Sequence, residues 1–227
     1  GRLIDHIQRG RIDFSRLEML VLDEADRMLD MGFIDDVEAI ASRTPDTRQT
    51  LLFSATLDSS IDKIALRLLK SPKRIQVAAQ HAKLDNIEQK LHYVDDLSHK
   101  NRLLNHLLQD ELLKQAIVFT ATKRDADTLA DSLALSGYEV AALHGDMNQR
   151  ERTRTLTRLR NGNLRILVAT DVAARGIDVS SITHVINFDL PKFAEDYVHR
   201  IGRTGRAGAA GVAVSFATGK DSISLKK

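Results

Sequence analysis

Nine short apolar runs, separated by longer amphipathic segments, constrain the fold of this chain more than any other feature of its sequence. The runs are 18–23, 50–54, 74–78, 90–94, 116–120, 139–143, 165–169, 184–188 and 211–216. Several are apolar throughout, which is typical of central parallel strands that are covered on both faces. Helical patterns lie between them, near 34–42, 58–70, 97–110, 123–136, 148–161 and 193–200. The alternation predicts an α/β fold with right-handed crossovers.

A polar stretch near 79–89 separates two strand–helix series. We therefore predict a first domain over 1–80, a linker over 81–89 and a second domain over 90–227. The first 80 residues carry 12 basic and 13 acidic side chains, whereas the remainder carries 21 and 18, so the second domain is mildly basic. Asp58 is a candidate cap for the 58–70 helix, and Gly137 is a candidate end for the 123–136 helix.

The composition excludes several classes of protein. The 227 residues are 43% hydrophobic and 28% charged, which is typical of a globular protein rather than a disordered one. The absence of cysteine excludes disulfides and thiolate metal sites. A net charge of +2 does not by itself predict a nucleic-acid partner. No apolar run approaches the roughly 20 residues of a membrane span, and no signal peptide is visible, so we expect a cytoplasmic protein.

Adjacent carboxylates follow the first apolar run, in the stretch LEMLVLDEADRML. Ligands of parallel sheets bind outside the carboxyl ends of the strands. Asp23 is placed there to hold Mg²⁺ through water, and Glu24 to orient or deprotonate an attacking water. The tetrapeptide alone is equally compatible with acids that merely open a surface helix; the preceding apolar strand favours a functional site.

Ser54, Ala55 and Thr56 end the next apolar run. Small hydroxyl side chains at that position can hydrogen-bond the carboxylates of the neighbouring strand. The tripeptide is common, so by itself it would indicate nothing more than a strand end.

The stretch HRIGRTGR, residues 199–206, places three arginines and a histidine beside two glycines. The glycines allow a tight backbone on which Arg203 and Arg206 point the same way. Guanidinium groups bind phosphate oxygens bidentately, and two of them at a γ-phosphate would act as arginine fingers. A solvated basic turn is the alternative, but glycine at every third position is unusual for one.

The stretch VATDVAARGIDV, residues 168–179, reads as a strand, a short helix of small residues and a turn. A helix that starts behind Thr170 would offer its backbone N–H groups to a phosphate. Asp178 is placed to bond a ribose hydroxyl. An ordinary strand–turn–helix is the alternative here.

Taken together, these stretches resemble the DEAD-box RNA helicases of superfamily 2. The resemblance rests on VLDEADRML, FSAT, IVFTAT, LHGDMNQRER, ATDVAARGIDV and HRIGRTGRAG, which occur in family order through essentially the whole chain. The sequences of these motifs are most similar to those of the bacterial RhlE-type subgroup. The resemblance implies two RecA-like domains, parallel sheets flanked by helices, that use ATP and Mg²⁺. It also implies RNA recognition through phosphates and 2′-hydroxyls, largely independent of sequence.

The resemblance also implies roles for individual residues. Asp23 matches the Mg²⁺ carboxylate and Glu24 the residue that activates water, while Asp26, Ser54 and Thr56 match the link between hydrolysis and strand separation. In the second domain, Arg203 and Arg206 would be the γ-phosphate fingers and His199 would support the interdomain contact. Gly176 and Asp178 match positions near the γ-phosphate and ribose. The RNA-contacting or supporting residues would be Arg2, Thr122, Gly145, Gln149, Arg152 and Thr170.

The phosphate-binding loop of such an enzyme is missing from the sequence. No G-x-x-x-x-G-K-[ST] occurs, and the only Gly-Lys pair, Gly219-Lys220, lacks the earlier glycine. In the family this loop and a glutamine motif that reads adenine precede the point where the chain starts. We therefore expect a fragment, truncated at both ends, whose parent is an ATP-dependent RNA helicase. The fragment itself is expected to be inactive.

Two alternatives remain open. In the first, the chain is a non-hydrolysing module that binds RNA. In the second, which fits its acidic motif less well, it is a piece of a DNA-directed superfamily 2 helicase. We further expect residues 84–220 to fold alone and residues 1–80 to fold poorly without the missing neighbouring strands.

Overall fold

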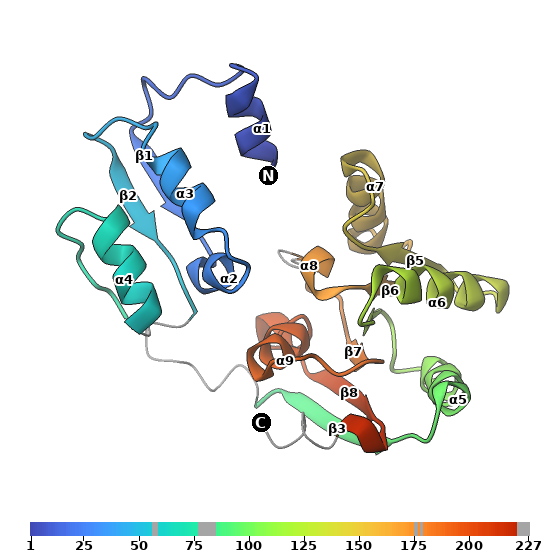
Figure 1. Cartoon of the computed structure of the whole chain (residues 1–227). Coiled ribbons are helices and arrows are strands. Elements are labelled where there is room, and N and C mark those ends of the chain that lie inside the picture. Colours follow the sequence, from blue (N-terminus) through green and yellow to red (C-terminus); the bar gives the residue numbers. More distant parts are fainter. Residues whose placement is uncertain (56–58, 77–84, 175–176, 178, 222–227) are drawn as a thin grey trace. The chain divides into compact units, whose positions relative to one another are not determined.

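The computed structural model describes residues 1–55, 59–76, 85–174, 177 and 179–221 (Figure 1). The chain divides into two compact units, Gly1–Ala78 and Ala79–Lys227, which we call unit 1 and unit 2. In both, parallel strands alternate with helices, so the α/β prediction is confirmed.

Unit 1 contains a sheet of two parallel strands, β1 (Met19–Leu22) and β2 (Gln49–Leu52). Its helices are α1 (Arg2–Gln8), α2 (Ala25–Asp30), α3 (Ile34–Ala41) and α4 (Ser59–Leu68). Its core is Leu22, Ala25, Ala41, Ile61, Ile64 and Leu68. Met19 and Val21, on the other face of β1, are 51% and 50% exposed. The described part of unit 1 therefore covers this sheet on one face only.

The strand predicted over 74–78 is wrong for the residues that the structure describes. Residues 74–76 form no strand, and Ile75 is 75% exposed. A strand needs a neighbour to accept its backbone hydrogen bonds, and the described two-stranded sheet pairs β1 and β2 only with each other. An apolar pattern alone cannot show that such a neighbour is present.

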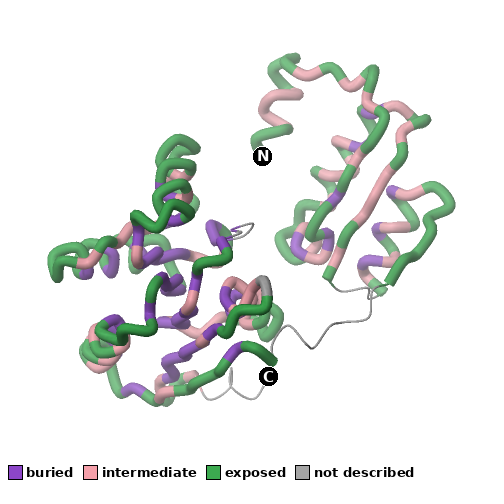
Figure 2. Tube along the Cα trace, turned by 180° about the vertical axis from the view of Figure 1, so that it is seen from behind, coloured by how far each residue is buried: buried purple, intermediate pink, exposed green. Residues whose placement is uncertain are grey.

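Unit 2 contains six parallel strands in the order β3-β8-β7-β4-β6-β5. The strands are β3 (Ile87–Tyr93), β4 (Ala116–Phe119), β5 (Val140–Leu143), β6 (Ile166–Ala169), β7 (His184–Asn187) and β8 (Gly211–Ala217). Every residue of β4, β6 and β7 is buried. Figure 2 shows this burial concentrated along the strands of unit 2, as the apolar runs predict.

Helices cover both faces of this sheet. They are α5 (Leu97–Leu108), α6 (Lys123–Leu135), α7 (Gln149–Arg160), α8 (Asp171–Ala174) and α9 (Ala194–Ile201), with a short 3-10 turn, η2 (Arg206–Gly208). One apolar cluster joins the sheet to α5 and α6, and a second joins it to α7 and α8. The sheet is therefore a closed layer between two sets of helices.

The sequence sets the helix ends through local polar groups. The side chains of Asp96 and Thr122 accept hydrogen bonds from backbone N–H groups at the start of α5 and α6. Asn148 and Glu151 form a capping box on α7. Gly137 follows α6 with φ +88°, so its predicted place at the helix end is confirmed. The predicted cap Asp58 lies outside the described residues.

The predicted boundaries of 1–80, 81–89 and 90–227 differ slightly from the structural elements. The division between the units falls after Ala78. β3 begins at Ile87, inside the predicted linker, because the strand pairs with β8 from Ile87 opposite Gly211 onward. The pairing, rather than the local apolar pattern, sets where this strand starts.

Candidate functional site

The two adjacent carboxylates of unit 1 lie directly after β1, and both residues are exposed. The backbone N–H of Glu24 donates to Oδ1 of Asp23 at 2.9 Å. The N–H of Ala25 donates to the carbonyl of Phe53 at 3.0 Å, which fastens this turn to the end of β2. The strand end therefore presents both acids to solvent on a backbone held by the neighbouring strand.

The backbone of Glu24 is left-handed, with φ 53° and ψ 49°. Only Glu24 and Ser71 combine a positive φ with a side chain other than glycine in the described part of the chain. For a residue with a Cβ this conformation is unfavourable, by of order 1 kcal/mol, and such residues cluster at functional sites. The strain coincides with the residue predicted to activate water.

Three further residues were predicted to surround these acids. Asp26 lies in the first turn of α2, where its Oδ1 accepts from the N–H of Arg27 at 2.9 Å. Ser54 follows β2, and its buried Oγ has no hydrogen-bond partner among the described residues. The expected bond from Ser54 to a carboxylate is thus not present in this structure. Thr56 lies outside the described residues, and Arg2 is the first residue of α1.

The arginine-rich stretch of unit 2 spans the end of α9 and the turn that follows. Arg200 is 3% exposed, whereas His199, Arg203 and Arg206 are half-buried. Nη1 of Arg203 donates to the carbonyl of Ile177 at 2.8 Å, and Nε of Arg206 donates to the carbonyl of Gly202 at 2.9 Å. Each guanidinium is thus held by a backbone carbonyl of unit 2.

Arg200 instead joins a buried network, which sequence reasoning missed. Its Nε and Nη2 donate to the two carboxylate oxygens of Asp171 at 2.6 and 2.8 Å. Its Nη1 donates to Oδ1 of Asn187 and to the carbonyl of Asp189, and the guanidinium lies 4.8 Å from the ring centroid of Phe119. The spacing of the three arginines in the sequence could not show that Arg200 is buried and structural while Arg203 and Arg206 remain partly exposed.

Asp189 extends the network to the other face of the sheet. One carboxylate oxygen accepts from Nζ of Lys100 at 2.6 Å, and the other accepts from the N–H of Ala121 at 3.0 Å. The network therefore connects the helix that carries the arginines to the loop after β4. The two donors hold this partly exposed carboxylate in one orientation.

Most residues predicted to contact RNA lie at one edge of the unit 2 sheet. Thr122, Gly145 and Thr170 follow β4, β5 and β6, and because the strands are parallel their carboxyl ends share that edge. Gln149 opens α7, and Nη2 of Arg152 donates to the carbonyl of Ala173 at 2.7 Å. The fold thus brings these residues to a common edge.

The surroundings of this edge are polar and open. A Cβ added to Gly145 would meet nothing within 4 Å, so internal packing does not require a glycine there. The ammonium of Lys123 hydrogen-bonds Asp146 and lowers the pKa of that carboxyl below its ordinary value. Oγ1 of Thr122 accepts from the N–H of Asp125 and donates to its carboxylate, so it is held by the cap of α6. Gly176 and Asp178 lie outside the described residues.

Two negative findings apply to the described residues. No group of three His, Cys, Asp or Glu side chains there could by itself enclose a metal ion. No helix among them is long and apolar enough to cross a lipid bilayer.

Comparison with known families gives one consistent result. The model of the DEAD/DEAH box helicase domain matches residues 1–64, and that of the helicase conserved C-terminal domain matches residues 99–208. The chain belongs to the DEAD-box helicase family. Its two units are accordingly RecA-like, with parallel sheets flanked by helices.

Named relatives of this DEAD-box helicase chain are bacterial. The DEAD-box ATP-dependent RNA helicase CshA of Geobacillus kaustophilus is 49% identical over 97% of this chain and 47% of the relative. The ATP-dependent RNA helicase DeaD of Mycobacterium tuberculosis is 47% identical over 100% of this chain and 40% of the relative. The chain thus spans about half the length of the curated relatives it matches. Neither name tests the RhlE-type subgroup, which stays a prediction.

Solved structures of DEAD-box proteins share this architecture. Dbp5 of S. cerevisiae, bound to RNA and ADP BeF3, has a TM-score of 0.85 and 34% identity, over 99% of this chain and 59% of that one. SrmB of E. coli, bound to the regulator of ribonuclease activity RraA, has a TM-score of 0.60 and 43% identity, over 62% of this chain and 83% of that one.

Proposed function

We propose that this chain forms the hydrolytic and RNA-contacting part of an ATP-dependent RNA helicase, in which RNA-stimulated ATP hydrolysis drives local unwinding of short duplexes. Family membership supports the activity, since both CshA and DeaD carry that description. A cytoplasmic location is part of the same proposal.

The observation that carries the proposal is the turn after β1. Asp23 and Glu24 are exposed at the carboxyl end of a parallel strand, and Glu24 has a strained left-handed backbone. Such strain persists only where the surrounding structure imposes it, here through the bond from Ala25 to Phe53. In the proposed role Glu24 orients the attacking water, while Asp26 and Ser54 communicate the state of the nucleotide to the rest of unit 1.

The chemistry of Asp23 fits Mg²⁺. Mg²⁺ keeps most of its waters and needs only one or two carboxylates from a protein, so a single exposed aspartate suffices. Oδ1 of Asp23 accepts the N–H of Glu24, which fixes the orientation of the carboxylate. When bound, Mg²⁺ neutralises charge on the phosphates of ATP.

In unit 2 we assign Arg203 and Arg206 to the γ-phosphate, His199 to a supporting role beside them, and Gly176 and Asp178 to the nucleotide. The remaining polar residues at the carboxyl edge of the sheet contact the RNA backbone. Electrostatic contacts to phosphates make such binding weaken as salt rises and leave it largely independent of sequence.

A second function, RNA binding without hydrolysis, is favoured for the 227 residues by themselves. They contain no G-x-x-x-x-G-K-[ST] stretch, so no lysine and no glycine-rich turn cradle the triphosphate. Positioning of the phosphates provides most of the catalysis in this reaction class. We therefore assign turnover to a protein that also contains the phosphate-binding loop.

The test measures RNA-stimulated ATP hydrolysis in two proteins. The 227-residue chain alone should bind RNA in a salt-sensitive way and hydrolyse no ATP. The same chain joined to the segment that precedes the matching region in the Geobacillus relative should regain RNA-stimulated turnover. Glu24→Gln in this fusion should lower kcat by about 10²-fold or more and leave ATP binding intact.

Glu18→Gln is the matched control, because Glu18 is an exposed glutamate just before β1. It should leave kcat unchanged. If the fusion hydrolyses ATP equally well with Glu24→Gln, the role assigned to Glu24 is wrong. If the 227-residue chain hydrolyses ATP by itself, other groups hold the phosphates and the second function is refuted.

A further inference from the structure

The strand β3 forms an open edge of the unit 2 sheet. Among the described strands it pairs only with β8, and its residues 88–91 are all exposed. The N–H of Val94 donates to Ala217, and the carbonyl of Asn86 accepts from Gly211, both toward β8. Because N–H and C=O of one residue point to the same side of a parallel strand, Gln89, Leu91 and Tyr93 direct theirs outward. The edge is a ready template for another strand.

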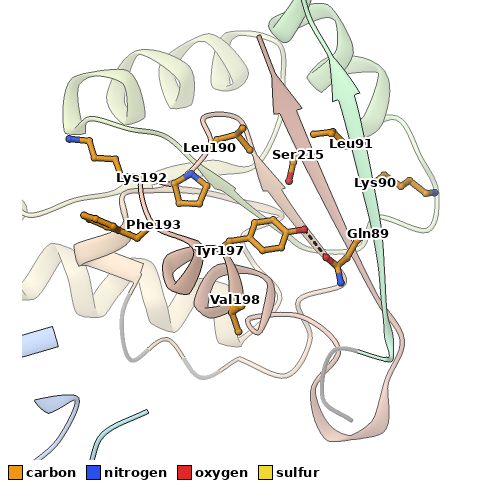
Figure 3. A pocket seen from close by; sticks show the side chains of 11 residues that line it. Gln89, Lys90, Leu91, Leu190, Lys192, Phe193, Tyr197, Val198 and Ser215 are labelled. Atoms are coloured by element: carbon orange, nitrogen blue, oxygen red, sulfur yellow. Dashed lines mark hydrogen bonds between the residues drawn. The ribbon is translucent and has the colours of Figure 1, made fainter. Parts of the chain in front are cut away.

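A cavity of about 460 Å³ lies beside this edge, between β3, β8 and the start of α9 (Figure 3). Its apolar lining includes Leu91, Leu190, Pro191, Phe193, Tyr197 and Val198. Phe193, Val198 and Leu91 are 59%, 45% and 44% exposed. Large apolar side chains that gather at one hollow, rather than lying singly, indicate a surface made for contact.

Polar groups at this cavity select its ligand. The hydroxyl of Tyr197 donates to Oε1 of Gln89 at 2.8 Å, which braces α9 against β3. Lys90 and Lys192 also contribute to the lining. Figure 3 shows the side chain of Lys90 directed away from Tyr197, on the other side of β3, where its ammonium pairs with Glu88 at 3.2 Å. The lining contains no carboxylate, so the exposed Lys192 gives it a positive charge.

We propose that β3 and this cavity form a docking site for an extended, acidic peptide segment of a protein partner. The segment adds to the sheet as a strand beside β3 and inserts one bulky apolar side chain between β3 and α9. Acidic residues beside that side chain meet Lys192. Strand addition provides affinity through the backbone, and the cavity provides specificity. The site is independent of the nucleotide and RNA residues proposed above.

A second copy of the chain fits this edge less well. The antiparallel two-fold pairing that uses all seven residues of β3 is centred on residue 90. It would place Lys90 directly opposite the Lys90 of the second copy, and like charges at that position are destabilising. An acidic strand removes this repulsion.

The experiment uses the full 227-residue chain and a capped, fluorescent peptide, Asp-Thr-Val-Phe-Val-Thr-Asp. Titration followed by anisotropy should show saturable binding. Phe193→Ser and Val198→Asp should each weaken it at least about tenfold, and Leu135→Ser, which changes a leucine on α6 that is 90% exposed, should change it less than about twofold. Lys192→Glu should weaken this peptide and strengthen one in which both aspartates are lysine.

Amide exchange locates the bound peptide. At saturation the outward N–H groups of Gln89, Leu91 and Tyr93 should exchange at least about tenfold more slowly, while those of the opposite edge strand β5 should not change. Both Phe193 and Val198 are exposed, and an unaltered circular dichroism spectrum for each variant separates loss of binding from loss of fold.

Several results would overturn the proposal. The first is a titration without saturable peptide binding. The second is peptide binding that is unchanged in Phe193→Ser and Val198→Asp. The third is slow exchange of the outward β3 amides before any peptide is added. Concentration-dependent dimers lost in Val198→Asp would assign the edge to a second copy. Protection of the same amides by a single-stranded RNA oligonucleotide would assign it to RNA.

Discussion

Unit 1 and unit 2 follow the same succession of parallel strand and helix, yet they bury their strands to different degrees. β4, β6 and β7 of unit 2 are buried at every residue, whereas only Leu22 is buried among the eight residues of β1 and β2. The apolar character of the runs is similar. The difference arises because a strand is enclosed only where other strands flank it and helices cover both faces.

The two units also differ in how they use charge. The ion pairs of unit 1 are exposed at one or both partners, such as Arg67 with Glu38, at 65% and 35%. In unit 2, Arg200 is nearly enclosed and satisfies four acceptors on Asp171, Asn187 and Asp189. A closed layer permits a buried polar network because it supplies enough partners to satisfy every donor.

The largest expected contrast is in amide exchange. The N–H of Ala116 donates to Arg165 within unit 2, and the N–H of Phe53 donates to Leu22 within unit 1. We expect the protection factor of Ala116 to exceed that of Phe53 by at least about 100-fold, because opening unit 1 exposes a smaller core. Hydrogen exchange followed by NMR measures both in one sample. Equal protection would show that unit 1 is as stable as unit 2 and would break the comparison.

A smaller contrast is expected when one arginine is removed from each unit. Arg200→Ala should lower the free energy of unfolding of unit 2 by about 3 kcal/mol, because Asn187 and Asp171 lose a buried partner. Arg67→Ala should lower that of unit 1 by less than about 1 kcal/mol, as for exposed ion pairs in general. Urea titrations followed by amide signals of each unit give both values. If Arg200→Ala lowers the free energy of unfolding no more than Arg67→Ala does, the buried network around Arg200 does not stabilise unit 2.

The smallest contrast is a pH dependence. Burial of His184 in β7 lowers the pKa of its imidazole; Asp110 and Glu88 raise this pKa by less, and Lys90 lowers it slightly further. Below about pH 6.5 the unfolded chain therefore binds a proton that the folded chain does not, so unit 2 loses stability as pH falls. One group contributes a slope of at most about 1.4 kcal/mol per pH unit.

The measurement is urea unfolding of the wild-type chain and His184→Gln between pH 7.5 and 5. The variant should show a shallower slope for unit 2 signals. Unit 1 has a single histidine, His6, outside its core, so its signals are an internal control. Identical slopes for both proteins would exclude His184 as the source.

Sequence reasoning succeeded where one stretch carried its own signal. The helices predicted over 123–136 and 148–161 are α6 and α7, and Asp23 and Glu24 follow a strand as the apolar run before them predicts. It failed where the outcome depended on a distant partner. Residues 74–76 have no strand to pair with, the Ser54 hydroxyl has no bond to a carboxylate, and β3 starts earlier than its apolar pattern.

The sequence by itself determined the family, the alternation of strands and helices in unit 2, and which residue types carry the chemistry, because these follow from local pattern and spacing. The tertiary structure alone decided that Arg200 is structural while Arg203 and Arg206 remain partly exposed. It also decided that β3 is an open edge beside an apolar cavity. The physical reason is that burial and hydrogen-bond partners depend on which segments the sheet brings together, and no stretch of sequence contains its own neighbours.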